Sequence, residues 1–418
     1  MEARIREEGA DSPREPVRIS RRRLVGSGLF AAGAAAGLGA SRLDGGDAEE
    51  RRADGAHVEF HGAHQAGIAT PPQRHMVFAA FDFGGERADE LRELLAAWSA
   101  VGARLTRGEP ARGDTGEALG LEPASLTLTF GLGPELFERD GDDRLGLAAR
   151  RPAPLRQIDG LAGETLEATR SGGDLAVQAC ADDAQVAFNA VHNLARVGRG
   201  AATLRWLQVG FSEAVGQGPR RTPRNLMGFK DGTNNLPAGD EREMLRHVWV
   251  GGADAPAWMR GGTYVVARRI RMLLDVWDST SVEEQERTIG RAKTSGAPLG
   301  ARREHDRVDL AAQSAAGPAV PADAHIRLAA PSSNGGARIL RRGYSYADGV
   351  DAATDQLDAG LFFISFQRDP GKQFVPMLRR LHQHDALNKH LMHTASAVFA
   401  CPPGARPRGY VGEGLFSA

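Results

Sequence analysis

A repeated order of strand-like and helix-like segments constrains the fold more than any other feature of this sequence. In the first half, a β-rich run at 75–83 precedes a segment at 89–100 whose apolar residues recur at helical spacing. A strand pattern at 175–180, a helix pattern at 183–197 and a further strand pattern at 204–209 follow. This half therefore predicts alternating strands and helices, with the helices on one side of a sheet.

The second half of the sequence repeats this theme. Strand patterns at 263–270 and 361–366 alternate with a charged helix pattern at 281–293 and a helix pattern at 374–383. Two such units in one chain favour an α+β fold of duplicated ferredoxin-like domains with antiparallel sheets. At 418 residues the chain has the length of one large or two medium domains, which agrees with a duplication.

The N-terminus has the pattern of an export signal. Arg21 and Arg22 precede a weakly apolar run at 24–40, which five glycines interrupt and which is too short for a good membrane span. The pattern resembles a twin-arginine signal, which predicts a periplasmic, secreted or cell-surface protein; the alternative is a disordered basic tail. The boundaries we predict are a signal peptide at 1–45, a linker at 46–66, an N-terminal half at 67–222 and a C-terminal half at 223–418.

Net charge and cysteine content exclude several classes of protein. The formal net charge is −1, so no global field attracts nucleic acid or an anionic membrane, and we expect no nucleic-acid partner. Cys180 and Cys401 are the only cysteines, and they offer no zinc cluster. They form either one disulfide in an exported protein or two buried, small apolar side chains.

Two long irregular stretches, 216–239 and 296–321, are the places to seek chemistry, because such segments in compact proteins usually carry function. The first contains Gly228-Phe229-Lys230-Asp231-Gly232-Thr233, in which an acid stands between glycines. Glycine lets a backbone approach a ligand closely, so Asp231 is a candidate for a pocket wall. On its own the segment is more typical of a surface turn, because Asp-Gly is a common turn dipeptide.

Two further segments carry a histidine and a pair of arginines. His325 begins an apolar stretch that Pro331 ends. A neutral imidazole there either ligates iron and leaves the opposite axial face open, or serves the structure alone. Arg341 and Arg342 are adjacent in a β-like stretch, so they point to opposite faces. One then reaches into a pocket while the other meets solvent or an acid; the alternative is a solvated basic edge.

Taken together, these segments resemble the signature of the dye-decolorising peroxidase (DyP-type haem peroxidase) family. The branch they resemble most is the exported one that includes the deferrochelatase-type peroxidases of iron-uptake operons. The resemblance extends over most of the chain after the signal. The segments that carry it are 64–68, 228–233, 324–327, 340–346, 366–370 and 396–404.

The resemblance implies a peroxidase with one haem b per chain, held in the C-terminal half. It implies His325 as the metal ligand, Asp231 as the distal acid and Arg341 as the distal arginine. Family members often carry asparagine where Ala330 stands, which puts one polar contact with the haem in doubt. The residues implied as further haem-lining positions are Gly232, Thr233, Asn234, Ala330, Pro331 and Ser332.

For the reaction, the resemblance implies Asp231 as a proton shuttle for H2O2 and Arg341 as an electrostatic stabiliser. We expect the second nitrogen of His325 to donate to an acceptor that raises its basicity. A carboxylate beside an arginine tends to stay ionised, so we expect activity to be best below neutral pH. A bulky dye or phenol cannot easily reach a buried haem, which suggests that electrons travel through relays of aromatic residues at the surface. Candidates for these relays, or alternatively for the core, are Tyr344, Tyr346, Trp258 and Trp277.

Two other functions stay open on the sequence. In the first, the protein chiefly releases iron from haem, or passes electrons, in an uptake system with a permease partner. In the second, it is a non-enzymatic module that binds a small molecule. Nothing in the sequence identifies the physiological reductant, and a homo-oligomer is neither indicated nor excluded.

Overall fold

The structure, a computed structural model, describes residues 57–158, 160–213, 222–252, 255–315, 317–352 and 354–417. The signal peptide predicted at 1–45 and the first part of the predicted linker lie outside the described residues. Among those that are described, we find no helix with the length and apolar character needed to span a bilayer.

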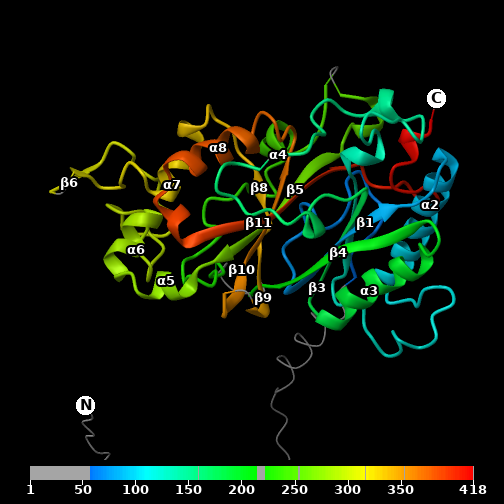
Figure 1. Cartoon of the computed structure of the whole chain (residues 1–418), viewed down its shortest axis with the longest axis horizontal. Helices are drawn as coiled ribbons and strands as arrows, with labels where there is room; N and C mark the ends of the chain where they lie inside the picture. The colour runs from blue at the N-terminus through cyan, green and yellow to red at the C-terminus, as the bar shows by residue number, and fades with distance from the viewer. Residues whose placement is uncertain are drawn as a thin grey trace, which may run out of the picture. The chain divides into compact units, whose positions relative to one another are not determined.

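The N-terminal half has the predicted alternation of strands and helices (Figure 1). Asp183 begins the second long helix, because its side chain accepts hydrogen bonds from the backbone N–H groups of Gln185 and Val186. The elements are β1 (His75–Phe83), α2 (Ala88–Leu105), β2 (Thr127–Leu132), β3 (Leu175–Ala181), α3 (Ala184–Val197) and β4 (Ala202–Phe211).

The C-terminal half repeats four long strands but has a longer first crossover. Its main elements are α4 (Glu241–His247), β5 (Thr263–Met272), β9 (Tyr344–Asp351), β10 (Gln356–Gln367), α8 (Phe374–His384) and β11 (Leu391–Cys401). The crossover between β5 and β9 contains α5 (Leu274–Asp278), α6 (Val282–Ile289), β6 (Gln313–Ser314), β7 (Gly317–Pro318), α7 (His325–Leu328) and β8 (Leu340–Arg341).

The long strands form one antiparallel sheet that closes on itself. Its order is β5-β11-β2-β3-β1-β4-β9-β10-β8, and β5 also pairs with β10. Within each half the order is that of a ferredoxin-like unit, β4-β1-β3-β2 in the first and β11-β5-β10-β9 in the second. The predicted fold, α+β with duplicated ferredoxin-like domains and antiparallel sheets, is confirmed.

Aromatic side chains fill the space that the closed sheet encloses. Phe78 stacks on Trp206 with 5.5 Å between the ring centroids, and it also contacts Phe362 and Phe399. Cys180 and Cys401 belong to the same cluster, both buried as free thiols, which agrees with their interpretation as small apolar side chains.

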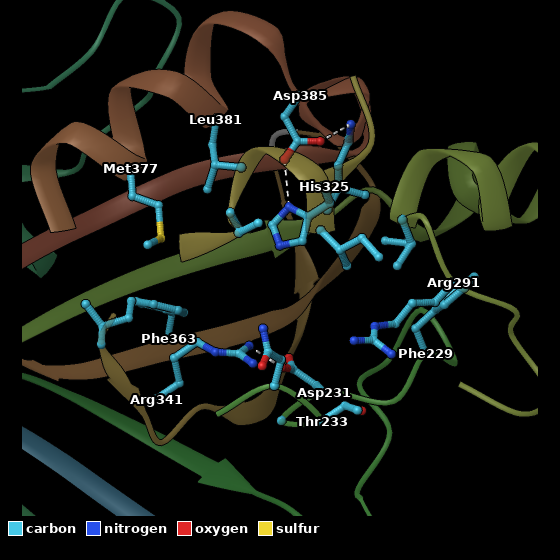
Figure 2. Close-up of a pocket in the computed structure, with 18 of the residues that line it drawn as sticks. Phe229, Asp231, Thr233, Arg291, His325, Arg341, Phe363, Met377, Leu381 and Asp385 are labelled. Atoms are coloured by element: carbon cyan, nitrogen blue, oxygen red, sulfur yellow. Dashed lines mark hydrogen bonds and ion pairs between the residues drawn. The ribbon is translucent and has the colours of Figure 1, made fainter. Parts of the chain in front are cut away.

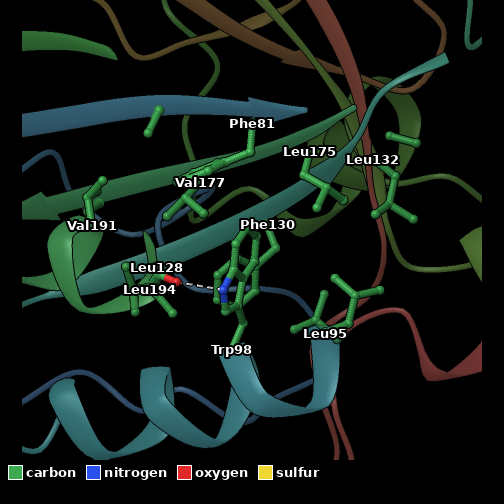
Figure 3. Close-up of a cluster of buried hydrophobic side chains, with 14 of the residues drawn as sticks. Phe81, Leu95, Trp98, Leu128, Phe130, Leu132, Leu175, Val177, Val191 and Leu194 are labelled. Atoms are coloured by element: carbon green, nitrogen blue, oxygen red, sulfur yellow. Dashed lines mark hydrogen bonds between the residues drawn. The ribbon is translucent and has the colours of Figure 1, made fainter. Parts of the chain in front are cut away.

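Outside the closed sheet, α2 and α3 cover the N-terminal half (Figure 1). Trp98 of α2 has no exposed surface and packs against Phe81 and Phe130. Its indole Nε1 donates to the carbonyl of Leu194 in α3 at 2.9 Å, so one side chain joins both helices to the sheet (Figure 3).

The segment before Gly67, predicted as a linker or loose arm, is part of the fold from residue 57 onward. Phe60 is buried and packs against Phe130. The amide of Gln65 bonds the backbone of Phe130 in one half and the carbonyl of Pro402 in the other. This arm therefore helps to join the two halves.

One other expectation from the sequence is corrected, and two strands were missed. The helix predicted at 281–293 ends at Ile289, because Gly290 adopts the left-handed region with φ of 91°. Strands β2 and β11 were not predicted. For the four aromatic residues considered as relays, the structure agrees with the alternative interpretation as core residues, with exposed fractions of 7% for Trp258, 1% for Trp277, 1% for Tyr344 and 0% for Tyr346.

Candidate active site

A cavity of about 580 Å³ lies in the C-terminal half. In the N-terminal half two long helices, α2 and α3, pack on the sheet, whereas the C-terminal half has only one long helix, α8. The 273–343 crossover replaces the other helix with short elements and long loops, which leaves room beside β5 and β10. A volume of this size is typical of a cofactor or substrate pocket.

His325 is the first residue of α7 and points into the cavity (Figure 2). Its Nδ1 lies 2.6 Å from Oδ2 of Asp385, whose other oxygen accepts the backbone N–H of Leu387 at 2.9 Å. An ionised carboxylate only accepts, so Nδ1 carries the proton and Nε2 is the nitrogen that faces the cavity. The predicted acceptor for the second nitrogen of His325 is therefore present, and it is Asp385.

Burial and charge act in opposite directions on the pKa of His325. Burial lowers this pKa, but the negative charge of Asp385 and its hydrogen bond outweigh burial and leave the pKa above its ordinary value. The accessible 35% of the imidazole side chain belongs to the cavity wall. The carboxylate fixes the orientation of the ring.

Asp231 and Arg341 lie on the opposite wall, below His325 in Figure 2. Nη1 of Arg341 donates to Oδ1 of Asp231 at 2.8 Å. Gly228 and Gly232 both have positive φ, 83° and 121°, so the turns around the acid need the glycines that the sequence supplies. Because Asp231 lines the cavity and pairs with Arg341, the segment is more than a plain surface turn.

The other residues predicted from the sequence also line the cavity. Thr233 donates to Oε1 of Glu304 at 3.1 Å, and Glu304 also binds Lys230, so the 296–321 stretch is fixed to the loop that carries Asp231. The predicted positions found on the cavity wall are Gly232, Thr233, Asn234, Ala330, Pro331 and Ser332, together with His325, Asp231 and Arg341.

Arg342 departs from its expectation. It is buried, and it meets neither solvent nor an acid. Its guanidinium donates to the carbonyl of Thr70 and to the side-chain oxygen of Gln73, both in the N-terminal half. The alternation of adjacent side chains was predicted correctly, but the second arginine anchors one half of the fold to the other.

Several cavity residues were not found from the sequence. Arg291 is buried, and its Nη1 donates to the carbonyls of Gly296 at 2.7 Å and Glu304 at 3.0 Å. Figure 2 shows its guanidinium directed into the cavity. Burial lowers the pKa of Arg291, partly offset by Glu304. Asp385 was missed because a single aspartate after a helix has no sequence signal.

A second polar group lines the cavity on the sheet side. Arg268 of β5 is buried and forms an ion pair with Glu164. Its Nη2 lies 3.2 Å from Nδ1 of His393. Burial, followed by the charge of Arg268, lowers the pKa of His393 to about 3. This histidine is therefore neutral at physiological pH, while the neighbouring positive charge is balanced by Glu164.

The two walls define the class of protein. A histidine held by a carboxylate faces an acid–arginine pair across a pocket of cofactor size. This arrangement is expected for an enzyme that converts a small molecule at a bound prosthetic group. The chain belongs to the Dyp-type peroxidase family: residues 65–212 match the N-terminal model of this family, and residues 222–406 match its C-terminal model.

Individual relatives agree with this assignment. The chain is 40% identical over 385 residues to the Dye-decolorizing peroxidase of Thermobifida fusca, covering 88% of this chain and 87% of that protein. It is 35% identical over 372 residues to the Deferrochelatase of Escherichia coli (strain K12), covering 85% and 86%.

Solved structures show the same likeness. A DyP-type peroxidase from Streptomyces coelicolor has a TM-score of 0.82 and 42% identity, covering 88% of this chain and 99% of that one. Ferric DtpA from Streptomyces lividans has a TM-score of 0.82 and 42% identity, covering 87% and 98%.

Dyp-type peroxidases bind haem, and this chain is a haem-dependent peroxidase of that family. The residues of the cavity fit the group. His325 offers a nitrogen of fixed orientation, which suits an axial ligand. Met377, Leu381 and Phe363 give an apolar wall for a porphyrin, and the guanidinium of Arg291 suits a carboxylate.

Proposed function

We propose that His325 ligates the haem iron and that Asp231 and Arg341, on the opposite wall of the cavity, act on H2O2. One observation carries the proposal: Asp385 binds Nδ1 of His325, so Nε2 faces the cavity, across from the Asp231–Arg341 pair. Arg291 would pair with a haem carboxylate. The positions that would line the haem are Gly232, Thr233, Asn234, Ala330, Pro331 and Ser332.

When bound, haem would supply the redox chemistry between peroxide and an organic reductant. The carboxylate of Asp231 accepts a proton from one peroxide oxygen and delivers it to the other. The guanidinium of Arg341 is a permanent cation that stabilises negative charge on the departing oxygen. The bond between these two side chains holds both in place before peroxide enters.

Substitutions on the peroxide side test these roles. We expect Arg341→Ala and Asp231→Asn to slow the reaction with H2O2 about 100- to 1000-fold, the usual cost of losing one preorganised electrostatic group. The measurement is stopped-flow absorbance after mixing with H2O2. Haem content and the resting visible spectrum serve as controls, because His325 lies on the other wall. Both variants reacting within about threefold of wild type would remove Asp231 and Arg341 from the mechanism.

The reductant is proposed to be a bulky organic molecule such as a dye or a phenol, in keeping with the Dye-decolorizing peroxidase relative. We propose that its oxidation is best below neutral pH, because a carboxylate base, unlike a histidine, can accept a proton in mildly acidic solution. A pH profile of dye turnover checks this, and an optimum above about pH 8 counts against Asp231 as the base.

Iron release from haem is a second candidate function, favoured by the relatives named Deferrochelatase. It would use the same cavity and would make an iron-uptake permease a natural partner. Incubation of the haem-loaded protein with a reductant and an iron chelator, without peroxide, tests it. Intact metal-free porphyrin with chelated iron supports release, whereas haem that stays whole supports a peroxidase alone.

We also propose that the chain is exported by the twin-arginine route. Support comes from Arg21, Arg22 and the weakly apolar run that follows them. A reporter fused after residues 1–45 should leave the cytoplasm, and replacing both arginines by lysine should keep it inside. Export of the reporter despite this double substitution would refute the proposal. The boundaries at 45 and 222 remain predictions.

A further inference from the structure

The side-chain amide of Asn235 binds the backbone of Arg341 at two points. Its Nδ2 donates to the carbonyl of Arg341 at 2.7 Å, and its Oδ1 accepts the N–H of Arg341 at 2.9 Å. The backbone N–H of Asn235 also donates to the carbonyl of Gly232 at 3.0 Å, which closes the turn directly after Asp231. Asn235 thus connects the loop of Asp231 with the strand of Arg341.

These two hydrogen bonds satisfy the backbone groups on the open side of strand β8. The strand has two residues and pairs on one side with β10, where Arg341 stands opposite Ser365. The next residue, Arg342, donates its N–H to Ile364 of β10 at 2.8 Å. In an antiparallel pair alternate residues direct their backbone groups away from the partner, so the groups of Arg341 point to the open side of β8. Asn235 takes the place of a neighbouring strand there.

We propose that Asn235 is a positioning residue, which sets where the guanidinium of Arg341 stands relative to Asp231. The proposal rests on the role proposed above for Arg341. Only an amide offers a donor and an acceptor side by side in the spacing of a backbone. The ion pair between Asp231 and Arg341 fixes the tips of two flexible side chains, whereas the amide of Asn235 fixes the backbone from which one of them extends.

The first test is Asn235→Ala in the haem-loaded protein. We expect the reaction with H2O2, followed by stopped-flow absorbance, to slow about 10- to 100-fold, because small displacements of a catalytic group are costly. Haem content and the resting spectrum should stay as in wild type, since His325 and Asp385 lie on the other wall.

A matched control separates positioning from general stability. The amide of Gln373 also joins backbone segments, donating to the carbonyls of His247 and Arg338, but neither of these bonds involves Arg341. Gln373→Ala should lower the melting temperature yet leave the peroxide reaction within about threefold of wild type. An equal slowing in both variants would overturn the proposal, because the effect would then follow stability.

The decisive test is a double-mutant cycle with Arg341→Ala. If Asn235 acts through Arg341, adding Asn235→Ala to Arg341→Ala changes the peroxide reaction by no more than about twofold. A full 10-fold or larger effect in that background overturns the proposal. If Arg341→Ala alone leaves the reaction unchanged, the proposed role of Arg341 fails, and the inference on Asn235 fails with it. If Arg341→Ala slows the peroxide reaction and Asn235→Ala does not, the inference on Asn235 is refuted while the proposed role of Arg341 stands.

Hydrogen–deuterium exchange gives a readout independent of activity. In haem-free protein, Asn235→Ala should speed exchange of the backbone amide of Arg341, because its acceptor is gone. Exchange in the strand 175–181 should not change. Unchanged protection at Arg341 would contradict the two-point attachment.

Discussion

Asp385 offers the sharpest test of how the chain would hold its haem. The two carboxylate oxygens serve two donors: Oδ2 takes Nδ1–H of His325 at 2.6 Å, and Oδ1 takes the N–H of Leu387 at 2.9 Å. In Asp385→Asn one oxygen remains for both donors, and the new amide N–H₂ faces the donor that is left over. The side chain is buried, so water does not replace the lost acceptor.

The size of the effect follows from the kind of bond. A hydrogen bond to a charged group contributes about 1.5–3 kcal/mol, and each 1.4 kcal/mol is a factor of ten. If the bond to His325 is the one lost, the imidazole is less basic and less well oriented. We therefore expect Asp385→Asn to bind haem about 10- to 100-fold more weakly, as for other partners of metal-binding histidines.

The assay is the rate of haem transfer from the protein to an excess of an apoglobin. Asp183→Ala serves as control, because Asp183 likewise accepts backbone N–H groups at the start of a helix but lies in the N-terminal half, away from the cavity. It should cost about 0.5–2 kcal/mol of stability and leave haem transfer unchanged. Transfer from Asp385→Asn within about twofold of wild type would refute the reasoning.

Two further predictions concern stability. Trp98→Ala should lower the free energy of unfolding by about 3–5 kcal/mol, seen in denaturant melts of haem-free protein, because it empties a fully buried site and removes the bond to Leu194; a loss below about 1 kcal/mol would contradict this. Burial raises the pKa of Glu304, but bonds from Lys230, Thr222 and Thr233 outweigh burial and leave the pKa below its ordinary value. Glu304 therefore stabilises the protein at neutral pH, and this contribution disappears as the pH falls through the lowered pKa. Melts of wild type and Glu304→Gln should accordingly differ at neutral pH and converge in acid; a constant difference would be evidence against it.

The repeated halves were predictable because their long elements carry strong local patterns. The segment at 75–83 is a β-rich, mostly apolar run and the helix around Trp98 shows helical periodicity, so tertiary packing only reinforces both. Closure of the sheet was not predictable. β11 contains many small residues, and the closure depends on its pairing with β2, a strand far away along the chain.

The site shows the same division between local and distant information. Glycines around Asp231 and the short segment at His325 were visible locally, but each also had a structural interpretation. Arg341 pairs with Asp231 across 110 residues, and Asp385 meets His325 across 60. No periodicity encodes such contacts, so only the family resemblance connected the first pair, and the second emerged from the folded chain alone.

The central claim is that His325 ligates the haem iron. It is tested most directly by the visible spectrum of His325→Gly, recorded with and without added imidazole. We predict that the variant loses the Soret absorption and peroxide turnover of wild type, and that imidazole bound in the vacated space restores both. A variant that keeps the wild-type spectrum and turnover without imidazole would contradict the claim.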